Sequence, residues 1–466
     1  GTNFTNSLLV GTDGTGTLSS AEKNTGVGKG VLAALTAGDE NTVVGYNAGT
    51  ALTTGTLNVA LGAYALDATT TAVQNTAIGG QALSANSTGA TNTAVGYNAL
   101  CANTTASENT AVGHSALDSN TTGYANTVVG KSALQSNTTG FANTAISKFS
   151  LYTNTTGCCN VAVGVNALIC NTTANDNTAV GSSALFANTT GTRNVAVGKS
   201  AFLSSTTASD SVMIGFTAGD AITTGTSNTG VGSDVMTSTT TGNKNIAMGG
   251  STLGANTTGS CNTAVGFQSM LANTTSDNNT AFGYKSLFTQ VADGARNTAI
   301  GLCALHGNTS GDDNVAVGYG AGDSNTTGSS NISVGSGALA ANTTASTSTA
   351  VGNLAMNANT TGGSQVAIGG CALVTNTTGY HNVSVGVNSL KLVTTGICNT
   401  AIGKDAGENT TTGSNNHGFG FAACASSATV SNEITLGNGS NNNLRCADTS
   451  ISTLSDLRDK TNVEDI

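Results

Sequence analysis

The chain contains neither proline nor tryptophan among its 466 residues, and only 4% of its residues are aromatic. Proline cannot donate a backbone hydrogen bond, so it is excluded from the interior of a β-sheet. Its complete absence is expected if nearly every backbone N–H donates to a hydrogen-bond ladder. The low aromatic content and a charged fraction of 8% are also typical of a disordered low-complexity segment, but the strict apolar periodicity described below argues against that alternative.

Basic residues are scarce as well, because 14 Lys and Arg stand against 24 Asp and Glu and give a net charge of −10. This balance excludes nucleic-acid binding through a basic surface. No run of 18 apolar residues exists, so we expect no membrane insertion. The first residues, Gly1 to Phe4, include no initiator Met and no signal peptide, which favours a fragment or a processed product.

What the sequence does contain is a five-residue motif, Asn-(Thr/Val)-small-(Val/Ile)-Gly, that occurs 24 times between residues 24 and 420. Successive copies begin seventeen positions apart, except for one longer step near Asp293 that holds an extra residue. With the opening Asn counted as the first position, Asn holds that position in 21 copies and Gly holds the fifth in 23. The representative structural pairs are Asn92 with Gly96, Asn109 with Gly113, and Asn126 with Gly130.

The short period of this repeat determines the predicted architecture. Helical repeats need about 33 to 47 residues, whereas shorter periods are typical of stacked strands. The length alone would suggest about three domains, but the repeat predicts one all-β element instead. That element is a parallel β-solenoid, or β-roll, of about 24 coils and a length of roughly 115 Å.

Each column of the repeat predicts a place in the coil. The apolar fourth residue and the ninth, usually Leu, are expected to point inward, with the second on the same face as the fourth. The third is Ala in 16 copies, which suits a tight subunit contact. The fifth-position Gly and the Asn-Thr-Thr-Gly stretch would supply corners of positive φ between two or more strands. The first-position Asn would stack as an amide ladder.

These patterns divide the chain into four predicted parts. Residues 1–23 form a cap or a connection to a preceding shaft, and residues 24–431 form the solenoid. Residues 432–454 are a β linker, and residues 455–466 begin a different segment. A faint earlier copy of the motif ends at Gly11. Because one coil buries too few side chains to be stable alone, neighbouring coils and neighbouring chains are expected to supply the remaining stability.

The last segment carries the only candidate catalytic residues. Residues 455–463 read Ser-Asp-Leu-Arg-Asp-Lys-Thr-Asn-Val. This string resembles the start of the C-terminal intramolecular chaperone of endosialidase-type phage tail spikes and fibres, although Asp459 stands where that family usually has Leu. The resemblance implies a self-cleavage pair of Ser455 and Lys460, with the cut before Asp456.

The chemistry has a physical basis of its own, since a serine becomes a nucleophile only when a base takes its proton, and a desolvated lysine can be that base. The alternative is a plain polar tail. A removable chaperone would also set the register of identical chains, which so short a repeat leaves free to slip.

The repeat itself is similar to shafts in viral tail fibres and, more distantly, to the heads of trimeric autotransporter adhesins, which stack short coils with an Asn-Ser-Val-Ala-Ile-Gly type motif of shorter period. Both resemblances imply a homotrimer. They imply a virion tail fibre or extracellular surface as the location, with other virion or appendage proteins as partners.

The variable sixth position is the candidate binding column. It is expected at an exposed corner or an inter-subunit groove, where aromatic rings either stack weakly on glycans or cover hydrophobic surface between chains. The candidate residues are Tyr46, Tyr97, Phe216, Phe267, Tyr284 and Tyr319. The ten cysteines and four histidines show no metal-ligand spacing, so no metal and no cofactor are expected.

The Asn-Thr-Thr stretches are formal glycosylation sequons and could suggest ice binding, but turn formation accounts for them sufficiently. The sequence therefore predicts a structural shaft of a trimeric viral tail fibre or surface appendage that supports host attachment, with glycan or receptor contact as a secondary role. The alternative is a cellular surface adhesin of the trimeric autotransporter-like type. Apart from self-cleavage, no enzyme activity is expected.

Overall fold

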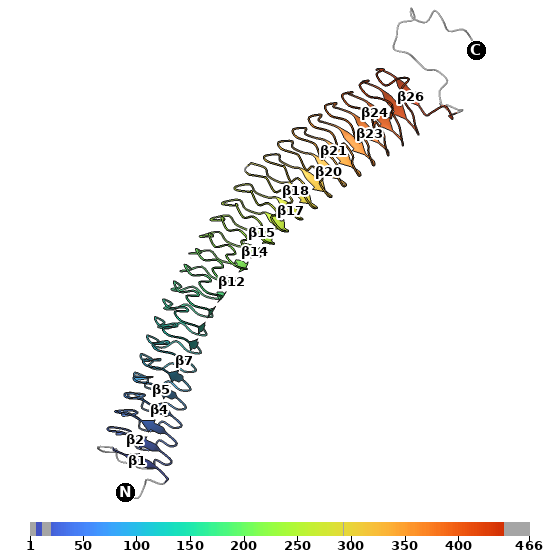
Figure 1. Ribbon diagram of the computed structural model, residues 1–466. Coiled ribbons are helices and arrows are strands. Elements are labelled where there is room, and N and C mark those ends of the chain that lie inside the picture. The colour runs from blue at the N-terminus through green and yellow to red at the C-terminus, as the bar shows by residue number, and fades with distance from the viewer. Residues whose placement is uncertain (1–5, 12–19, 292, 442–466) are drawn as a thin grey trace, which may run out of the picture.

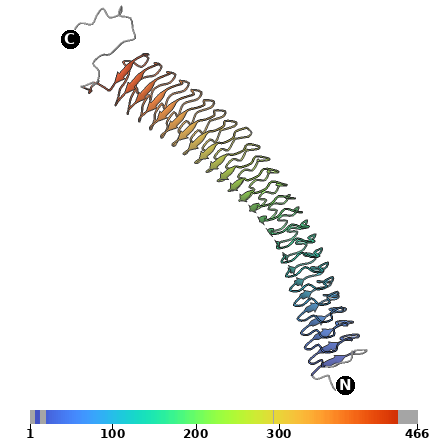
Figure 2. The same ribbon diagram turned by 180° about the vertical axis from the view of Figure 1, so that it is seen from behind.

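The computed structural model describes residues 6–11, 20–291 and 293–441. In these ranges the chain winds into coils that stack along one axis, and each strand pairs in parallel with those of the adjacent coils. The stack forms a gently curved rod, with the strand of residues 8–10 near one end and the strand of residues 434–436 near the other (Figures 1 and 2). The predicted parallel β-solenoid is confirmed, and the described residues include 26 strands and no helix.

The strands, in chain order, are β1 (Leu8–Val10), β2 (Thr25–Val27), β3 (Thr42–Val44), β4 (Val59–Leu61), β5 (Thr76–Ile78), β6 (Thr93–Val95), β7 (Thr110–Val112), β8 (Thr127–Val129), β9 (Thr144–Ile146), β10 (Val161–Val163), β11 (Thr178–Val180), β12 (Val195–Val197), β13 (Val212–Ile214), β14 (Thr229–Val231), β15 (Ile246–Met248), β16 (Thr263–Val265), β17 (Thr280–Phe282), β18 (Thr298–Ile300), β19 (Val315–Val317), β20 (Ile332–Val334), β21 (Thr349–Val351), β22 (Val366–Ile368), β23 (Val383–Val385), β24 (Thr400–Ile402), β25 (His417–Phe419) and β26 (Ile434–Leu436). The stack therefore extends beyond the motif-defined range of 24–431 at both ends, because β1 pairs with β2 and β26 pairs with β25.

Each coil contributes a single three-residue strand, so the expectation of two or more strands per coil was wrong. The rest of the coil consists of turns that still hydrogen-bond to the next coil. Leu100 N donates to Ala116 O at 3.0 Å, for example, and Thr104 N donates to Thr121 O at 3.1 Å. The inter-coil bonds thus continue around the coil without extended backbone, which is consistent with the absence of proline.

The side-chain directions in the strands correct a second expectation. In β6 the third-position Ala94 is completely buried, whereas Thr93 and Val95 on either side are only partly buried. The third-position residue therefore faces the interior, and the apolar fourth position faces outward. The ninth-position leucines, such as Leu100, are fully buried as predicted.

The interior is narrow, which explains why its wall is built from alanine. A Cβ added at Gly26, a third-position glycine, would lie 2.4 Å from Leu9 Cδ2 and 3.0 Å from Val31 Cγ1. The third position therefore packs directly against apolar side chains of the same and the preceding coil. The long side chain of Met213 fits there beside two glycines, Gly219 and Gly230.

Positive φ occurs at the predicted fifth-position Gly, but it does not occur at the glycine of Asn-Thr-Thr-Gly. Gly113 has a φ of 141°, and a Cβ there would lie 2.5 Å from Gly130 O. Gly123, by contrast, is absent from the left-handed region. Apart from Asp293 in the longer step, the other left-handed residues within the repeats fall at the seventh, ninth and seventeenth positions, as in Asn98, Leu100 and Glu108. These conformations make the sharp bends that close each coil.

Candidate functional site

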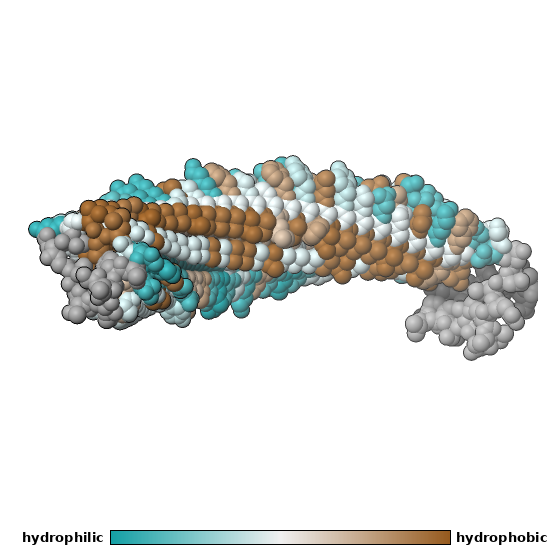
Figure 3. Space-filling model, turned by 90° about the horizontal axis from the view of Figure 1, so that it is seen from below, coloured by the Kyte–Doolittle hydropathy of each residue, from teal (hydrophilic) through white to brown (hydrophobic). Residues whose placement is uncertain are grey.

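An exposed apolar face runs along the outer side of the strands. It is made by the apolar fourth-position side chains and by the second-position side chains, which are Thr in 14 of the 24 motif copies and Val or Ile in nine. Hydrophobic residues lie in continuous rows along the rod in the space-filling view (Figure 3). Exposed fractions along the fourth position include 40% at Val129, 38% at Ile146, 41% at Ile300 and 57% at Phe282.

The six candidate aromatic residues of the sixth position are exposed, as expected for that corner. Their exposed fractions lie between 46% at Tyr284 and 65% at Tyr319. Two of them lie together, because Phe267 and Tyr284 stack in adjacent coils with ring centroids 6.0 Å apart. Three others contact a different residue: Tyr46 meets Tyr64, Tyr97 meets His114, and the Lys199 ammonium lies over Phe216. The aromatic residues of the sixth position therefore form separate local clusters along the rod.

The first-position asparagines form the predicted ladder, and each side chain is buried. Asn109 Oδ1 accepts from the backbone N and the side-chain Nδ2 of Asn126, at 3.0 and 3.1 Å. Asn109 Nδ2 in turn donates to Asn92 Oδ1 at 3.3 Å and to Gly123 O at 3.0 Å. One amide thus joins three successive coils and satisfies a buried backbone N–H at the entry to the next strand. These residues are structural.

The fifth-position glycines of the same coils complete this arrangement. Gly96, Gly113 and Gly130 have φ values of 137°, 141° and 142°. A Cβ on any of them would lie 2.4 to 2.5 Å from the carbonyl oxygen of the fifth-position residue one coil ahead. Glycine is required at these corners because the backbones of adjacent coils approach each other closely.

The proposed cleavage residues Ser455, Asp456 and Lys460 lie outside the described residues. The self-cleavage hypothesis therefore stays a prediction from the sequence.

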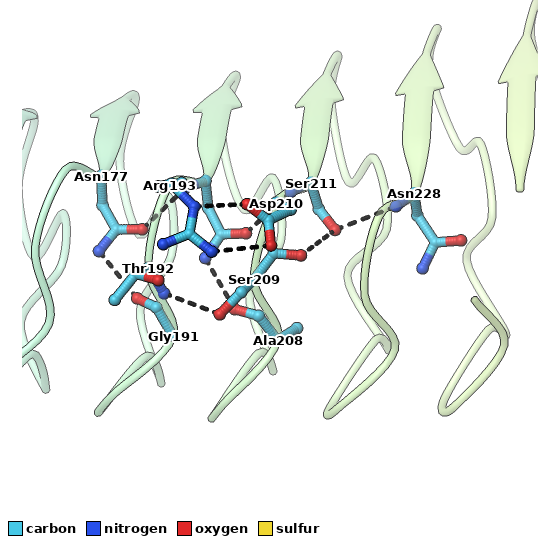
Figure 4. A network of polar contacts seen from close by, with 10 residues as sticks. Asn177, Gly191, Thr192, Arg193, Ala208, Ser209, Asp210, Ser211 and Asn228 are labelled. Atoms are coloured by element: carbon cyan, nitrogen blue, oxygen red, sulfur yellow. Dashed lines mark hydrogen bonds and ion pairs between the residues drawn. The ribbon is translucent and has the colours of Figure 1, made fainter. Parts of the chain in front are cut away.

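Charged residues at the seventeenth position form exposed pairs between adjacent coils. Arg193 donates to Asp210 through two bonds, Nε to Oδ1 at 2.6 Å and Nη2 to Oδ2 at 3.0 Å (Figure 4). Arg296 and Asp313 repeat the same geometry. The arginine in each pair lowers the pKa of its aspartate. These pairs align neighbouring coils at the surface, where solvent screening makes the stability contribution small.

Three tenth-position aspartates have the opposite shift. Partial burial raises the pKa of Asp67, Asp118 and Asp220. Asp67 Oδ1 and Asp220 Oδ1 are buried and accept no hydrogen bond from protein. The three lie in coils far apart along the axis, so they do not form a paired acid–base site.

The described cysteines are all free thiols. Burial raises the pKa of Cys158, Cys170 and Cys303, which disfavours the reactive thiolate. In the part of the chain that the structure describes, no group of three or more His, Cys, Asp or Glu residues could hold a metal ion. A search of the same residues for membrane-spanning helices found none.

Two features were missed in the sequence. The first is the apolar strand face, because the fourth position was assigned to the interior. The second is another Asn ladder at the twelfth position, where Asn103 Nδ2 donates to Asn86 Oδ1 at 2.9 Å and Asn120 Nδ2 donates to Asn103 Oδ1 at 3.0 Å. The recurrence of these asparagines in seven successive coils, from Asn86 to Asn188, was the available signal, but it was interpreted only as turn formation.

Comparisons of the chain with protein-family models and with curated proteins found no match.

Proposed function

We propose that this chain is the structural shaft of a homotrimeric fibre, such as a viral tail fibre, that holds an attachment element away from its base. The observation that carries this proposal is the apolar strand face. Soluble monomers rarely expose a contiguous apolar patch larger than a few hundred Å². A face that continues over 26 strands exceeds that limit and needs a cover.

The expected cover is a further copy of the same chain. The face repeats once per coil, about every 4.8 Å along the axis, so a partner with the same axial repeat can match every row. A three-residue strand width of about 10 Å gives roughly 50 Å² per coil and on the order of 1,200 Å² for the whole strand face, its Thr side chains included. A trimer would share this face between two partners, about 600 Å² each, which is of the same order as the roughly 800 Å² per partner of a standard interface.

Three chains with their strand faces turned toward a common axis would bury all three faces at once. The trimeric state itself comes from the resemblance to tail-fibre shafts and adhesin heads. The polar turn sides would then face solvent, consistent with the exposed charged pairs and the net charge of −10. Such an assembly is a stiff rod, and its role is mechanical and adhesive.

Sedimentation equilibrium of the intact chain tests the proposal. We expect a particle mass three times the chain mass of 45.4 kDa. The double variant Val129→Asp/Ile146→Asp places charge on the strand face and should shift the population toward monomer. The control Ala125→Asp/Ala142→Asp adds the same charge at the seventeenth position of neighbouring coils, where Asp210 and Asp313 occur naturally, and should remain trimeric.

A monomeric wild-type chain would refute the proposal. Equal masses for wild type and the strand-face variant, with the control also unchanged, would show that the subunit contact lies elsewhere. Expression with the full C-terminus, with Ser455 intact and as Ser455→Ala, tests the self-cleavage hypothesis separately. Equal subunit lengths would contradict it.

A further inference from the structure

A hollow of about 420 Å³ lies on the turn side of the solenoid, over four successive coils between residues 303 and 357. Its borders are formed by sixth-, seventh- and tenth-position residues. They include His306, Tyr319, Gly320, Asp323, Leu354 and Asn357.

The hollow lies beside two adjacent coils that lack a side chain at the seventh position, and its open space is over Gly320, because at Gly337 a Cβ would lie 2.9 Å from Leu354 Cδ2. That position carries Asn, Ser, Gln or another side chain in most coils, and it is Gly only at residues 30, 320 and 337. Residues 320 and 337 are the only successive pair. A Cβ placed on Gly320 would meet no heavy atom within 4 Å, so the space above this residue is open.

Apolar surface borders the hollow on two sides. Tyr319 is 65% exposed, the highest value among the seven Tyr and Phe residues of the sixth position, and Leu354 is 37% exposed. Both side chains are far more exposed than a core residue of the described chain. An exposed tyrosine ring beside a depression offers a flat apolar face with a polar hydroxyl at its end.

Polar groups lie along the remaining border. His306 Nδ1 and Asp323 Oδ1 are 3.9 Å apart, and the imidazole is held in place by stacking on Phe288 with ring centroids 5.1 Å apart. Asn357 is fixed by a 2.8 Å bond from its Nδ2 to Gly337 O. The hollow thus combines one aromatic ring with a carboxylate, an imidazole and an amide, two of which are held by neighbouring groups.

We propose that this hollow binds one pyranose unit of a neutral saccharide. The C–H face of a sugar ring would lie on Tyr319, and its hydroxyls would donate to Asp323 and exchange hydrogen bonds with His306 and Asn357. An anionic sugar is disfavoured because Asp323 lies in the site and the chain carries a net charge of −10. The hollow is open to solvent, so we expect a dissociation constant of about 1 mM for one copy.

Saturation-transfer NMR with the intact chain tests this assignment. The probes are the methyl glycosides of glucose, galactose, mannose and N-acetylglucosamine, with methyl sialoside as the anionic probe. We expect transfer to at least one neutral glycoside and none to the sialoside. Tyr319→Ala should weaken binding about tenfold, while Tyr97→Ala, which removes a ring from the same column in a coil without the hollow, should leave binding unchanged.

A second variant fills the hollow without removing any contact group. Gly320→Asn introduces the residue present at Asn47, Asn98, Asn166 and Asn388, all of which adopt positive φ at the seventh position. The coil therefore tolerates it, and glycoside binding should be lost while circular dichroism is unchanged. The proposal is overturned if no neutral glycoside binds at 10 mM (about −2.7 kcal/mol), if Gly320→Asn binds like wild type, or if the sialoside binds more tightly. The outcome is independent of the oligomeric state.

Discussion

Two stretches of the solenoid share the same strands but differ at the twelfth position. Seven successive coils carry Asn there, from Asn86 to Asn188, and these amides form an unbroken second ladder. In the following coils the position holds Ser205, Ile222 and Thr239, all buried, and the ladder stops. The parallel pairing of the strands continues through both stretches without a change of register. The second ladder is therefore dispensable for stacking.

The first ladder differs because it also satisfies the backbone. Where Ser211 replaces Asn, its N still donates to Asn194 Oδ1 at 3.1 Å, and its Oγ accepts from Asn228 N at 3.1 Å (Figure 4). At the twelfth position the backbone N–H is satisfied locally, as in Asn137 N donating to Leu134 O. An apolar residue such as Ile222 can thus replace Asn there without exposing an unpaired backbone donor.

The largest effect is expected from replacing one amide of each ladder by leucine. Asn126→Leu removes the acceptor of both Asn143 N and Asn143 Nδ2 and should lower the free energy of unfolding by about 2–4 kcal/mol. Asn120→Leu, the matched control, removes one partner of Asn137 Nδ2, which keeps its bond to Gly140 O, and should cost about 1–2 kcal/mol. Urea unfolding followed by circular dichroism measures both. A larger loss of unfolding free energy for Asn120→Leu than for Asn126→Leu would contradict the conclusion that the first ladder is the more important one.

Rebuilding the interrupted ladder should produce a non-additive gain. Ile222→Asn alone buries an amide between Ser205 and Thr239 and should cost about 1–3 kcal/mol. The triple variant Ser205→Asn/Ile222→Asn/Thr239→Asn restores a continuous ladder from Asn188 and should be more stable than the single variant. The single variant is also expected to increase hydrogen exchange in its own coil. If the triple variant is less stable than the single one, neighbouring amides do not stabilise each other at this position.

Ser147 interrupts the fifth-position glycines within the first stretch, and its replacement should be stabilising. It has a φ of 110°, which is unfavourable for a residue with a side chain. Ser147→Gly should raise the free energy of unfolding by about 0.5–2 kcal/mol, measured as an increase in the urea midpoint. The reciprocal change, Gly130→Ser, should lower the midpoint because its Cβ would lie 2.5 Å from Ser147 O. An unchanged or lower midpoint for Ser147→Gly would contradict the strain argument.

The smallest effect concerns Asp220 in the second stretch. Burial raises the pKa of Asp220 in the folded chain, so its contribution to stability is greatest below its unfolded pKa and is lost as the pH rises through the folded pKa. Asp220→Asn should therefore stabilise the chain at pH 7 by less than about 1 kcal/mol, allowing for solvent screening. This advantage should disappear below about pH 4. Thermal unfolding at both pH values is the measurement, and an equal difference at both would show that the carboxyl charge is not the cause.

Much of the fold could be predicted because it depends on recurrence. The anchors at Asn92, Asn109 and Asn126 recur at one constant interval in the sequence, and the strands that follow them pair at that same interval. The burial of Leu100 and its equivalents was predicted correctly as well. The predicted side-chain directions of Ala94 and Val95 were wrong. Two-residue alternation requires only that neighbouring side chains point to opposite sides of the strand, and it does not say which side is the interior. Larger apolar residues were assigned to the interior, although the narrow coil accommodates alanine there.

The surface sites were harder to predict. The exposure of Tyr319 followed from the variability of its column, but the hollow beside it depends on residues from four coils. Gly320 was visible in the sequence as one glycine among 62. That Gly320 borders a hollow could not be predicted, because the hollow also depends on Gly337 in the adjacent coil and on the side chains around both residues.

The sequence by itself determined the period, the vertical alignment of equivalent residues and the first amide ladder, because a repeated buried amide pairs best with its own copy one coil away. Only the tertiary structure decided which side of each strand is interior and that one strand per coil is sufficient. Those outcomes depend on the left-handed bends at the seventh, ninth and seventeenth positions. These bends set the width of the coil and thereby the size of the side chains that fit inside it.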